Sequence, residues 1–406
     1  KEKPSACLLL TFLFDHSMVA NFIENIPTLV VCDNFNDYHR NFKNKSKITL
    51  YYPKDKMPEL RNMTFHPKIY IIKFKKYIKL VIGPGNLLKN DWEMYGNIFY
   101  SECFKLKTQE NKNNDNREFK RYLINYIKEI MKDDYKEYIL KGLKLNLEDY
   151  VFDNPSISLL GSLPRLTDSK DEFKISYFRM QEIIKNHPPM IEYSETNTTI
   201  YYFSSSIGCL NFNSCYDLVN SVIPNIPDRM TAYGNKNSIT DLVRVIYPSK
   251  FYINNSYLNE KGSKCLFLSK ENYDMFRFTK SSLYNFELVN SNTEWVTPHY
   301  KVILILNNNK IDDDSTIYIG SHNFTENAWG RSIINKKELE SQKNNKNENK
   351  VKDNTKFAVL NYELGVVFHP EVNSKRNKLE IIKSLGVQIN TKKYGIDDEP
   401  FINSSH

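Results

Sequence analysis

The sequence predicts an α/β protein with two similar α-β-α sandwich domains, which contain mixed sheets, are related by a pseudo-twofold axis and share one functional site between them. Three observations support this fold class. Strand-sized apolar segments alternate with helical ones, and a short motif of His, Lys and Asn occurs once in each half. The 406 residues, of which 40% are hydrophobic, suffice for two or three domains with sizeable cores. We expect residues 1–150 to form the first domain and residues 151–406 the second.

The first half begins with alternating strand and helix patterns. Ala6–Phe14 is apolar enough for a buried strand, and the helical pattern of Met18–Ile26 is stopped by Pro27. Apolar and β-branched side chains predict four more strands, at Thr28–Val31, Ile48–Tyr52, Lys68–Phe74 and Lys79–Ile82. The order strand, helix, strand, strand is typical of an α/β layer with a mixed sheet.

A polar stretch and a long helix separate the two halves. Thr108–Arg117 is dense in Asn, Lys and Asp and predicts a surface loop. Apolar side chains recur at i+3 and i+4 from Phe119 to Met131, which predicts an amphipathic helix that runs to about Leu140. A second α/β series begins near Ile157. Its expected helix is Phe178–Lys185, and its expected strands are Thr199–Phe203, Leu242–Tyr247, Lys301–Leu306, Thr316–Ile319 and Phe357–Phe368.

Composition and charge narrow the classes of function. The 56 basic minus 48 acidic residues give a net charge of +8, which suits a polyanionic partner without proving one. The six cysteines lack metal-ligand spacing, so we expect reduced thiols in an intracellular protein rather than a metal site. No apolar segment approaches the roughly 18 to 20 residues of a membrane span. The chain begins at Lys1 rather than Met, so we expect a fragment or a processed form.

One segment of the second half has low complexity. Glu338–Lys356 is dominated by Asn, Lys, Glu and Gln, with almost nothing to bury. It predicts a disordered insertion between two strands, and the alternative is an arm that binds nucleic acid.

An internal repeat is the strongest signal in the chain. Each copy contains a His-x-Lys motif, a strand, and a turn with small residues that ends in Asn. The first copy comprises His66-Pro-Lys68 and Gly83-Pro-Gly-Asn86, and the second comprises His299-Tyr-Lys301 and Gly320-Ser-His-Asn323. The spacing from Lys to Asn is 18 residues in the first copy and 22 in the second. Asp91-Trp92 follows the first copy, and Ala328-Trp329 follows the second.

The repeated residues suit chemistry at phosphorus. A His-x-Lys motif at the start of a strand places both side chains on one face, because side chains alternate along a strand. Two such half-sites would surround one phosphate with Lys charges, Asn amide donors and two imidazoles. One imidazole can attack to form a phosphohistidine while the other protonates the leaving oxygen and then activates water. No metal or cofactor is required, because two Lys and two Asn can stabilise the developing charge.

These repeats resemble the phospholipase D superfamily, whose usual pattern is HxK, four residues, then Asp. The Asp positions hold Lys73 and Leu306 here. This loss, with the Asn turns kept, resembles the tyrosyl-DNA phosphodiesterase family, which removes stalled topoisomerase I peptides from DNA 3′ ends. The similarity runs from about Leu8 to Pro370. Further segments that resemble the family are Leu159–Pro164, Phe203–Gly208, Val245–Ser249, Asn327–Gly330 and Asn361–Val366.

The resemblance implies a role for each motif residue. His66 would be the nucleophile, and His299 the general acid and then the base. The residues that would bind phosphate oxygens are Lys68, Lys301, Asn86 and Asn323. Glu363 matches a carboxylate that orients a catalytic imidazole, which fixes its tautomer, although it could be an ordinary strand carboxylate. Ser205 and Ser206 match paired serines that hold the DNA backbone, although they could form a plain polar turn.

The sequence also departs from the family. The family's aromatic residue four positions before the first histidine is Asn62 here, and Phe65 could replace it or belong to the core. The segment after Trp92 is one residue short, so the family's Gln has no clear counterpart. The Trp-rich C-terminal ending is absent. These departures concern substrate binding more than the catalytic chemistry.

The resemblance implies a metal-independent DNA repair phosphodiesterase that hydrolyses the 3′-phosphotyrosyl bond. The implied substrate is a single-stranded or frayed DNA 3′ end with a topoisomerase I peptide, the implied location is the nucleus, and we expect a monomer with no cofactor and no membrane contact. One alternative is a phospholipase D-like lipid phosphodiesterase, which the missing Asp residues disfavour. The other is a non-catalytic nucleic-acid-binding relative, which the two intact His/Lys pairs disfavour.

Overall fold

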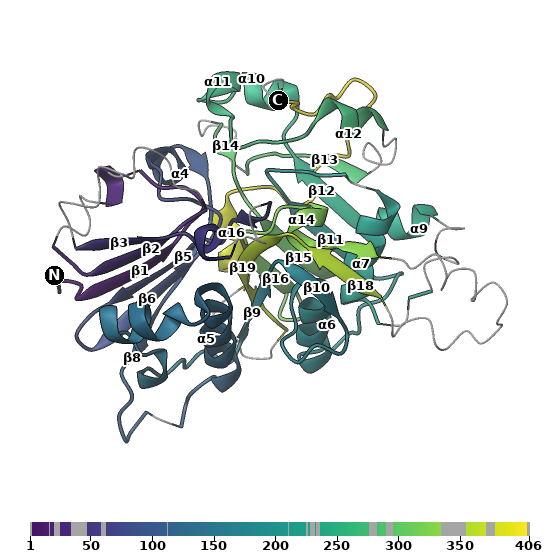
Figure 1. Cartoon of the computed structure of the whole chain (residues 1–406). Helices are drawn as coiled ribbons and strands as arrows, with labels where there is room; N and C mark the ends of the chain where they lie inside the picture. Colours follow the sequence, from purple (N-terminus) through teal and green to yellow (C-terminus); the bar gives the residue numbers. More distant parts are fainter. Residues whose placement is uncertain are drawn as a thin grey trace.

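The computed structural model describes residues 2–15, 17–19, 25–33, 47–57, 62–111, 113–209, 211–224, 226–227, 232, 236–275, 282–289, 295–333, 355–370 and 378–403. Two large mixed sheets lie side by side and form the centre of the molecule (Figure 1). The first sheet comes from the N-terminal part of the chain, and all but one strand of the second come from the part after residue 150.

The first sheet has six strands in the order β3-β2-β1-β5-β6-β8. Their bounds are β1 Ala6–Leu10, β2 Thr28–Val31, β3 Ile48–Tyr51, β5 Ile69–Lys73, β6 Tyr77–Ile82 and β8 Tyr100–Lys105. β1, β2 and β3 are parallel to one another, whereas β1–β5, β5–β6 and β6–β8 are antiparallel. The sheet is therefore mixed, as predicted.

The second sheet has eight strands, in the order β13-β12-β11-β15-β16-β19-β4, with β9 also paired to β19. Their bounds are β4 Thr64–Phe65, β9 Ile157–Ser162, β11 Thr198–Phe203, β12 Val243–Tyr247, β13 Leu283–Asn285, β15 Val302–Asn307, β16 Thr316–Gly320 and β19 Asn361–Phe368. β11, β12 and β13 are parallel, and β11–β15, β15–β16 and β16–β19 are antiparallel.

The two sheets repeat one topology. The series β3-β2-β1-β5-β6-β8 and the series β13-β12-β11-β15-β16-β19 have the same strand order and the same relative directions. The prediction of a duplicated α/β unit with mixed sheets is thus confirmed. β4, from the first half of the chain, pairs with β19 of the second sheet, so the chain crosses between the sheets before residue 150. The division of the chain into domains at residue 150 stays a prediction.

The remaining strands form two small sheets. One has the order β10-β18-β17, with β10 Arg165–Asp168, β17 Arg331–Ile333 and β18 Lys356–Val359. The other pairs β7, Tyr95–Gly96, with β14, Thr297–Pro298.

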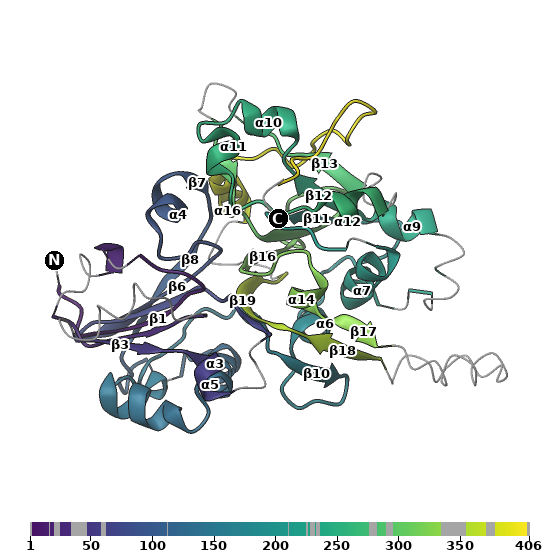
Figure 2. The ribbon, with the colours of Figure 1, turned by 45° about the horizontal axis from the view of Figure 1, so that its top comes forward.

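Helices cover the sheets (Figure 2). The longer ones are α5 Arg117–Met131, α6 Ser176–Asn186, α7 Phe212–Val222 and α16 Lys378–Leu385. The short ones are α3 Pro53–Lys56, α4 Lys89–Glu93, α9 Lys236–Asp241, α10 Lys250–Asn254, α11 Asn259–Gly262, α12 Lys270–Met275 and α14 Glu326–Trp329. A π-helical segment, η2 Lys136–Gly142, and a 3₁₀ turn, η3 Leu147–Asp149, follow α5.

The predicted helix of the middle region is present but shorter than expected. Asn116 caps α5, because its side chain accepts a hydrogen bond from the backbone N–H of Phe119. The helix ends at Met131 rather than near Leu140, because Lys132 adopts a φ of +50°, which interrupts the helical backbone. The apolar pattern continues beyond this point, but in the separate π-helical segment.

Two strand predictions were wrong in detail, and one strand of the first sheet was not predicted. The first strand ends at Leu10 instead of Phe14. The segment Phe357–Phe368 forms two strands, because Leu360 separates β18 from β19 and the two belong to different sheets. β8 was not predicted, since half of its six residues are polar or charged.

Two further predictions concern residues that the structure describes only in part. In the helix predicted at Met18–Ile26, Met18 and Val19 are helical, and residues 20–24 lie outside the described residues. The predicted insertion lies outside them from 338 to 354, and its last residue, Lys356, begins β18. None of the described helices is long and apolar enough to cross a membrane.

Candidate active site

His66 lies in a three-residue link between two strands. β4 ends at Phe65 and β5 begins at Ile69, so the His-x-Lys motif precedes the strand. The prediction that the motif lies at the start of the strand is wrong by these bounds. The backbone N–H of His66 donates to the carbonyl oxygen of Tyr362 at 3.1 Å. This bond extends the parallel pairing of β4 with β19, which therefore fixes the backbone that carries the imidazole.

Glu363, the residue after Tyr362, binds the imidazole of His66. Oε2 of Glu363 lies 2.8 Å from Nδ1 of His66. Glu363 is fully buried, and its two oxygens also accept from the Ser321 hydroxyl at 2.5 Å and from Nδ2 of Asn361 at 3.1 Å. A carboxylate can only accept, so Nδ1 of His66 carries the proton and Nε2 presents a lone pair.

Two glycines allow the strands beneath Glu363 to approach. Gly320 of β16 and Gly365 of β19 are paired in register. A Cβ on Gly365 would lie 2.2 Å from the ring of Tyr318, and one on Gly320 would lie 2.1 Å from its hydroxyl. The glycines thus leave room for the Tyr318 ring at the point where Ser321 meets Glu363.

His299 has the same arrangement, with partners from the first half of the chain. Its backbone N–H donates to the carbonyl oxygen of Gly96 at 2.8 Å, next to the pairing of β14 with β7. Its Nδ1 lies 3.1 Å from Oδ1 of Asn97 and 3.3 Å from Oδ1 of Asp91. Both partners are acceptors, so Nδ1 of His299 is also the protonated nitrogen.

The two histidines are therefore oriented reciprocally. Each one follows a two-residue strand that pairs with a strand from the opposite half of the chain. In both cases the residue after the backbone acceptor supplies the side chain that binds Nδ1: Glu363 follows Tyr362, and Asn97 follows Gly96. The orienting groups differ, because His66 contacts a carboxylate, whereas His299 contacts both the amide of Asn97 and the carboxylate of Asp91.

Both motif lysines are fully buried beside the histidines. Nζ of Lys68 donates to the carbonyl oxygen of His66 at 2.7 Å, and Nζ of Lys301 donates to that of His299 at 3.2 Å. Burial lowers the pKa of Lys301 to about 8 and lowers the pKa of Lys68 well below its ordinary value. The charge of Lys301 also acts on Lys68 and on His66, so the two half-sites lie within electrostatic range of each other.

The pKa values of the imidazoles are low. Burial, followed by the charge of Lys301, lowers the pKa of His299 to about 3 although Asp91 opposes the shift. Burial also lowers the pKa of His66, again against the effect of Glu363. Burial acts to raise the pKa of Glu363, but its interactions with His66 and with the nearby charges outweigh burial and lower it to about 2. Near neutral pH the free protein therefore holds two neutral imidazoles, an ionised Glu363 and a positive charge on Lys301.

Hydrogen bonds fix the side chains of the two motif asparagines, Asn86 and Asn323. Oδ1 of Asn323 accepts from the backbone N–H of Ser206 at 3.1 Å and from the hydroxyl of Ser205 at 3.2 Å. Oδ1 of Asn86 accepts from the backbone N–H of Leu13 at 3.4 Å, and its backbone N–H donates to Oδ1 of Asp91 at 3.0 Å. Each amide is thus fixed with its Nδ2 as the remaining donor, although Nδ2 of Asn86 lies 3.4 Å from the same Asp91 oxygen.

The two predicted serines take different positions. Ser205 is buried, and its hydroxyl binds Asn323, so the structure makes it a support for the amide. Ser206 is partly exposed on the rim of the same turn. The predicted contact of both serines with DNA remains a prediction, and the geometry favours Ser206 for it.

Aromatic residues near the site also answer an open question. Phe65 is buried and packs against Tyr362, so it belongs to the core and does not replace the aromatic residue missing at Asn62. The ring of Phe12 instead lies 5.5 Å from the ring of His66, and Nζ of Lys68 lies 5.7 Å from its centre.

Sequence reasoning missed Asn97 and Phe12 and gave no role to Asp91. Asp91 was visible in the Asp-Trp pair after the first motif, but Asn97 has no local signal. Its position depends on the pairing of β7 with β14, which joins residues about 200 positions apart.

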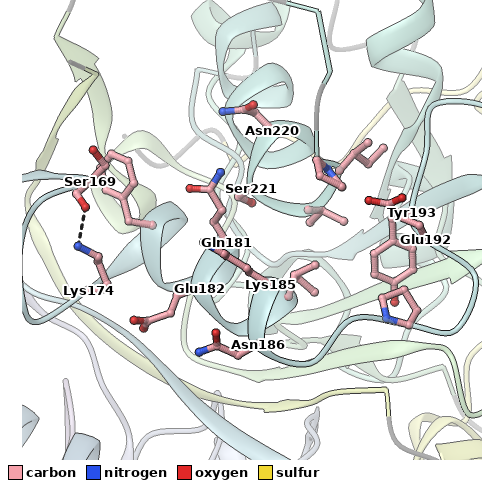
Figure 3. A pocket seen from close by; sticks show the side chains of 16 residues that line it. Ser169, Lys174, Gln181, Glu182, Lys185, Asn186, Glu192, Tyr193, Asn220 and Ser221 are labelled. Atoms are coloured by element: carbon pink, nitrogen blue, oxygen red, sulfur yellow. Dashed lines mark hydrogen bonds between the residues drawn. The ribbon is translucent and has the colours of Figure 1, made fainter. Parts of the chain in front are cut away.

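Among the residues that the structure describes, no group of three or more His, Cys, Asp and Glu side chains could hold a metal ion. A cavity of about 600 Å³ lies elsewhere, along α6 and the end of α7, and is lined by residues such as Lys174, Lys185, Tyr193 and Asn220 (Figure 3). It contains none of the predicted site residues.

Comparison with known proteins identifies a matching family and structures with a similar fold. A family model described as tyrosyl-DNA phosphodiesterase matches residues 1–400. The crystal structure of the yeast tyrosyl-DNA phosphodiesterase superposes with a TM-score of 0.67 at 15% identity, covering 100% of this chain and 94% of that chain. A histidine-to-arginine mutant of the yeast enzyme gives 0.67 at 13% identity, covering 99% and 94%. At these identities the likeness to solved structures concerns the fold.

Proposed function

Because the chain belongs to the tyrosyl-DNA phosphodiesterase family, we propose that it hydrolyses the bond between a tyrosine and the 3′ phosphate of DNA through a phosphohistidine on His66. The observation that carries this proposal is the reciprocal orientation of His66 and His299, each with Nδ1 protonated and Nε2 available, beside two buried lysines. This arrangement supplies one nucleophile, one proton donor and the positive charge that a phosphoryl transfer needs.

In the first step, Nε2 of His66 attacks phosphorus and the P–O bond to tyrosine breaks. The leaving phenolate takes a proton from Nε2 of His299, which yields free tyrosine and a phosphohistidine. His299 must be protonated for this step, and its pKa of about 3 in the free protein reflects burial and the charge of Lys301. A bound phosphodiester offsets the lysine charges, so substrate binding raises this pKa and prepares His299 as the acid.

In the second step, neutral His299 takes a proton from water, and the oxygen attacks phosphorus. The P–N bond to His66 breaks, which releases a DNA 3′ phosphate and restores the imidazole. Glu363 stays ionised throughout, so it stabilises the positive charge on the His66 ring while the adduct exists. The amide donors of Asn86 and Asn323 and the two lysines bind the phosphate oxygens.

The proposal includes further points about the reaction and its setting. The reaction needs no metal, because lysines and amides supply the charge stabilisation. The substrate is a single-stranded or frayed DNA 3′ end that carries a topoisomerase I peptide, and the protein acts in the nucleus as a monomer. The net charge of +8 supports a DNA substrate, whose binding should weaken as salt rises.

The test is to incubate the protein in EDTA with a 5′-labelled, 3′-phosphotyrosyl oligonucleotide. A 3′-phosphate product that is absent with His66→Ala supports the proposal. Activity on phosphatidylcholine vesicles with none on the oligonucleotide would instead favour the lipid phosphodiesterase. Inactivity of both the parent and His66→Ala, with DNA binding retained, would favour a non-catalytic relative.

A further inference from the structure

A segment that precedes α12 crosses the rim of the candidate site. At one end, the carbonyl oxygen of Gly262 accepts from the hydroxyl of Tyr95, which belongs to β7 beside His299. At the other end, the backbone N–H of Phe267 donates to the carbonyl oxygen of Ser205 at 2.9 Å, and its carbonyl oxygen accepts from Ile207 at 2.8 Å. The segment 262–268 therefore joins the His299 side of the site to the serine turn that holds Asn323.

These bonds fix the side on which the Phe267 ring lies. Phe267 and Ser206 form an isolated parallel β-bridge, and side chains of bridged residues project to the same side. The neighbours of Phe267, Leu266 and Leu268, are buried on the other side. Phe267 is 41% exposed, so a large aromatic side chain is presented on the solvent side, next to the partly exposed Ser206.

We propose that Phe267 stacks on a base of the DNA strand close to the scissile phosphate. This inference rests on the proposed function and adds a residue that contacts the substrate. Ser206 is bridged to Phe267, and its backbone N–H binds Oδ1 of Asn323. The Ser206 hydroxyl and Nδ2 of Asn323 are therefore hydrogen-bond donors for phosphate close to the aromatic side chain. An aromatic ring beside backbone-binding donors is the arrangement with which proteins hold single-stranded nucleic acid, since every base has a face that can stack.

Two other phenylalanines near the site are placed differently. Phe65 is buried in the core. Phe12 lies beside His66 and Lys68, in the other half-site. Among the residues that the structure describes, Phe267 is an exposed aromatic residue whose backbone is bonded to the serine turn, which places it on the same side as Ser206 and Asn323.

The experiment measures single-stranded 3′-phosphotyrosyl oligonucleotides with Phe267→Ala, Phe267→Trp and the parent protein. Phe267→Ala should raise KM about 10-fold, within the range for loss of one stacked base, and leave kcat within about 2-fold. Phe267→Trp should restore KM, because the larger ring also stacks. Phe251→Ala is the matched control, since Phe251 is 70% exposed on α10 and should leave KM unchanged.

A second series locates the base. Abasic sites are placed singly at each of the last three nucleotides of the substrate. One of them should raise KM for the parent about as much as Phe267→Ala does, and should have no further effect on Phe267→Ala. If every abasic substrate lowers the activity of both proteins equally, or if Phe267→Ala behaves as Phe251→Ala does, the inference is wrong.

The same substrates separate this inference from its premise. If the parent protein releases no tyrosine from the intact oligonucleotide, the proposed function itself fails. If Phe267→Ala affects substrates with a long peptide but not those with tyrosine alone, the ring contacts the peptide instead of a base, and the stacking proposal is overturned.

Discussion

Replacing Glu363 by Gln tests how much the adduct depends on a charged partner for His66. The amide has the shape of the carboxylate, so Oε1 of the Gln can still accept from Nδ1 of His66 and from Ser321. Its NH₂ group would face Nδ2 of Asn361, which lies 3.1 Å from Glu363 in the parent protein. Asn361 is partly exposed and can turn its oxygen towards the new donor, so the fold should survive the change.

The expected loss follows from the charge on the ring. When Nε2 bonds to phosphorus, the His66 ring becomes positive, and a carboxylate about 4 Å away stabilises it by about 4 kcal/mol at an effective dielectric constant of about 20. The neutral hydrogen bond of the Gln recovers about 1 kcal/mol. The remaining 3 kcal/mol or so corresponds to a first step about 10²-fold slower for Glu363→Gln.

The assay is single-turnover release of tyrosine, measured by rapid quenching with protein in excess over the oligonucleotide. Glu102→Gln is the control, because Glu102, on β8, is half-buried and likewise accepts two side-chain hydrogen bonds, from the Tyr100 hydroxyl and from Nδ2 of Asn154. This control should keep the parent rate. A Glu363→Gln rate within about 3-fold of the parent would refute the argument that the carboxylate stabilises a charged ring.

Three further outcomes are expected. His299→Asn should trap DNA on His66, because a phenol with a pKa of about 10 can leave without full protonation, whereas the attacking water needs a base. A denaturing gel should then show a slowly migrating protein–DNA band that is absent with His66→Ala. Asp91→Asn should slow hydrolysis of the adduct about 10-fold, since Asp91 makes His299 a stronger base, and chasing isolated adduct with buffer measures this rate. Affinity for a 3′-phosphorylated oligonucleotide should fall above pH 8, where Lys301 loses its proton and positive charge, and Lys301→Arg should move this fall to higher pH in a fluorescence titration.

The duplicated fold could be predicted from the sequence because the repeat that indicates it is local. The His-x-Lys motifs and their Asn turns lie within about 25 residues of each other in each copy, and the repeated strand order confirms the duplicated fold that they predict. Glu363 came only from the resemblance. Its burial and its bond to His66 fit the expected place, although its catalytic role is a proposal.

The contacts between the halves could not be predicted, for a physical reason. β4, β7 and β14 have two residues each, too few for any periodic pattern, and their partners lie far away in the chain. Asn97 reaches His299 only through one of these pairings. The break at Leu360 was missed likewise, because a largely apolar segment does not reveal that its two parts pair with different sheets.

Because each imidazole is held by the opposite half of the chain, the effects of sequence variants cross over between the halves. A change at Asp91 or Asn97, in the first half, acts on the second histidine, whereas a change at Glu363, near the C-terminus, acts on the first. Two alleles that damage the same half can therefore affect different histidines. Two alleles more than 200 positions apart, such as one at His66 and one at Glu363, can affect the same histidine.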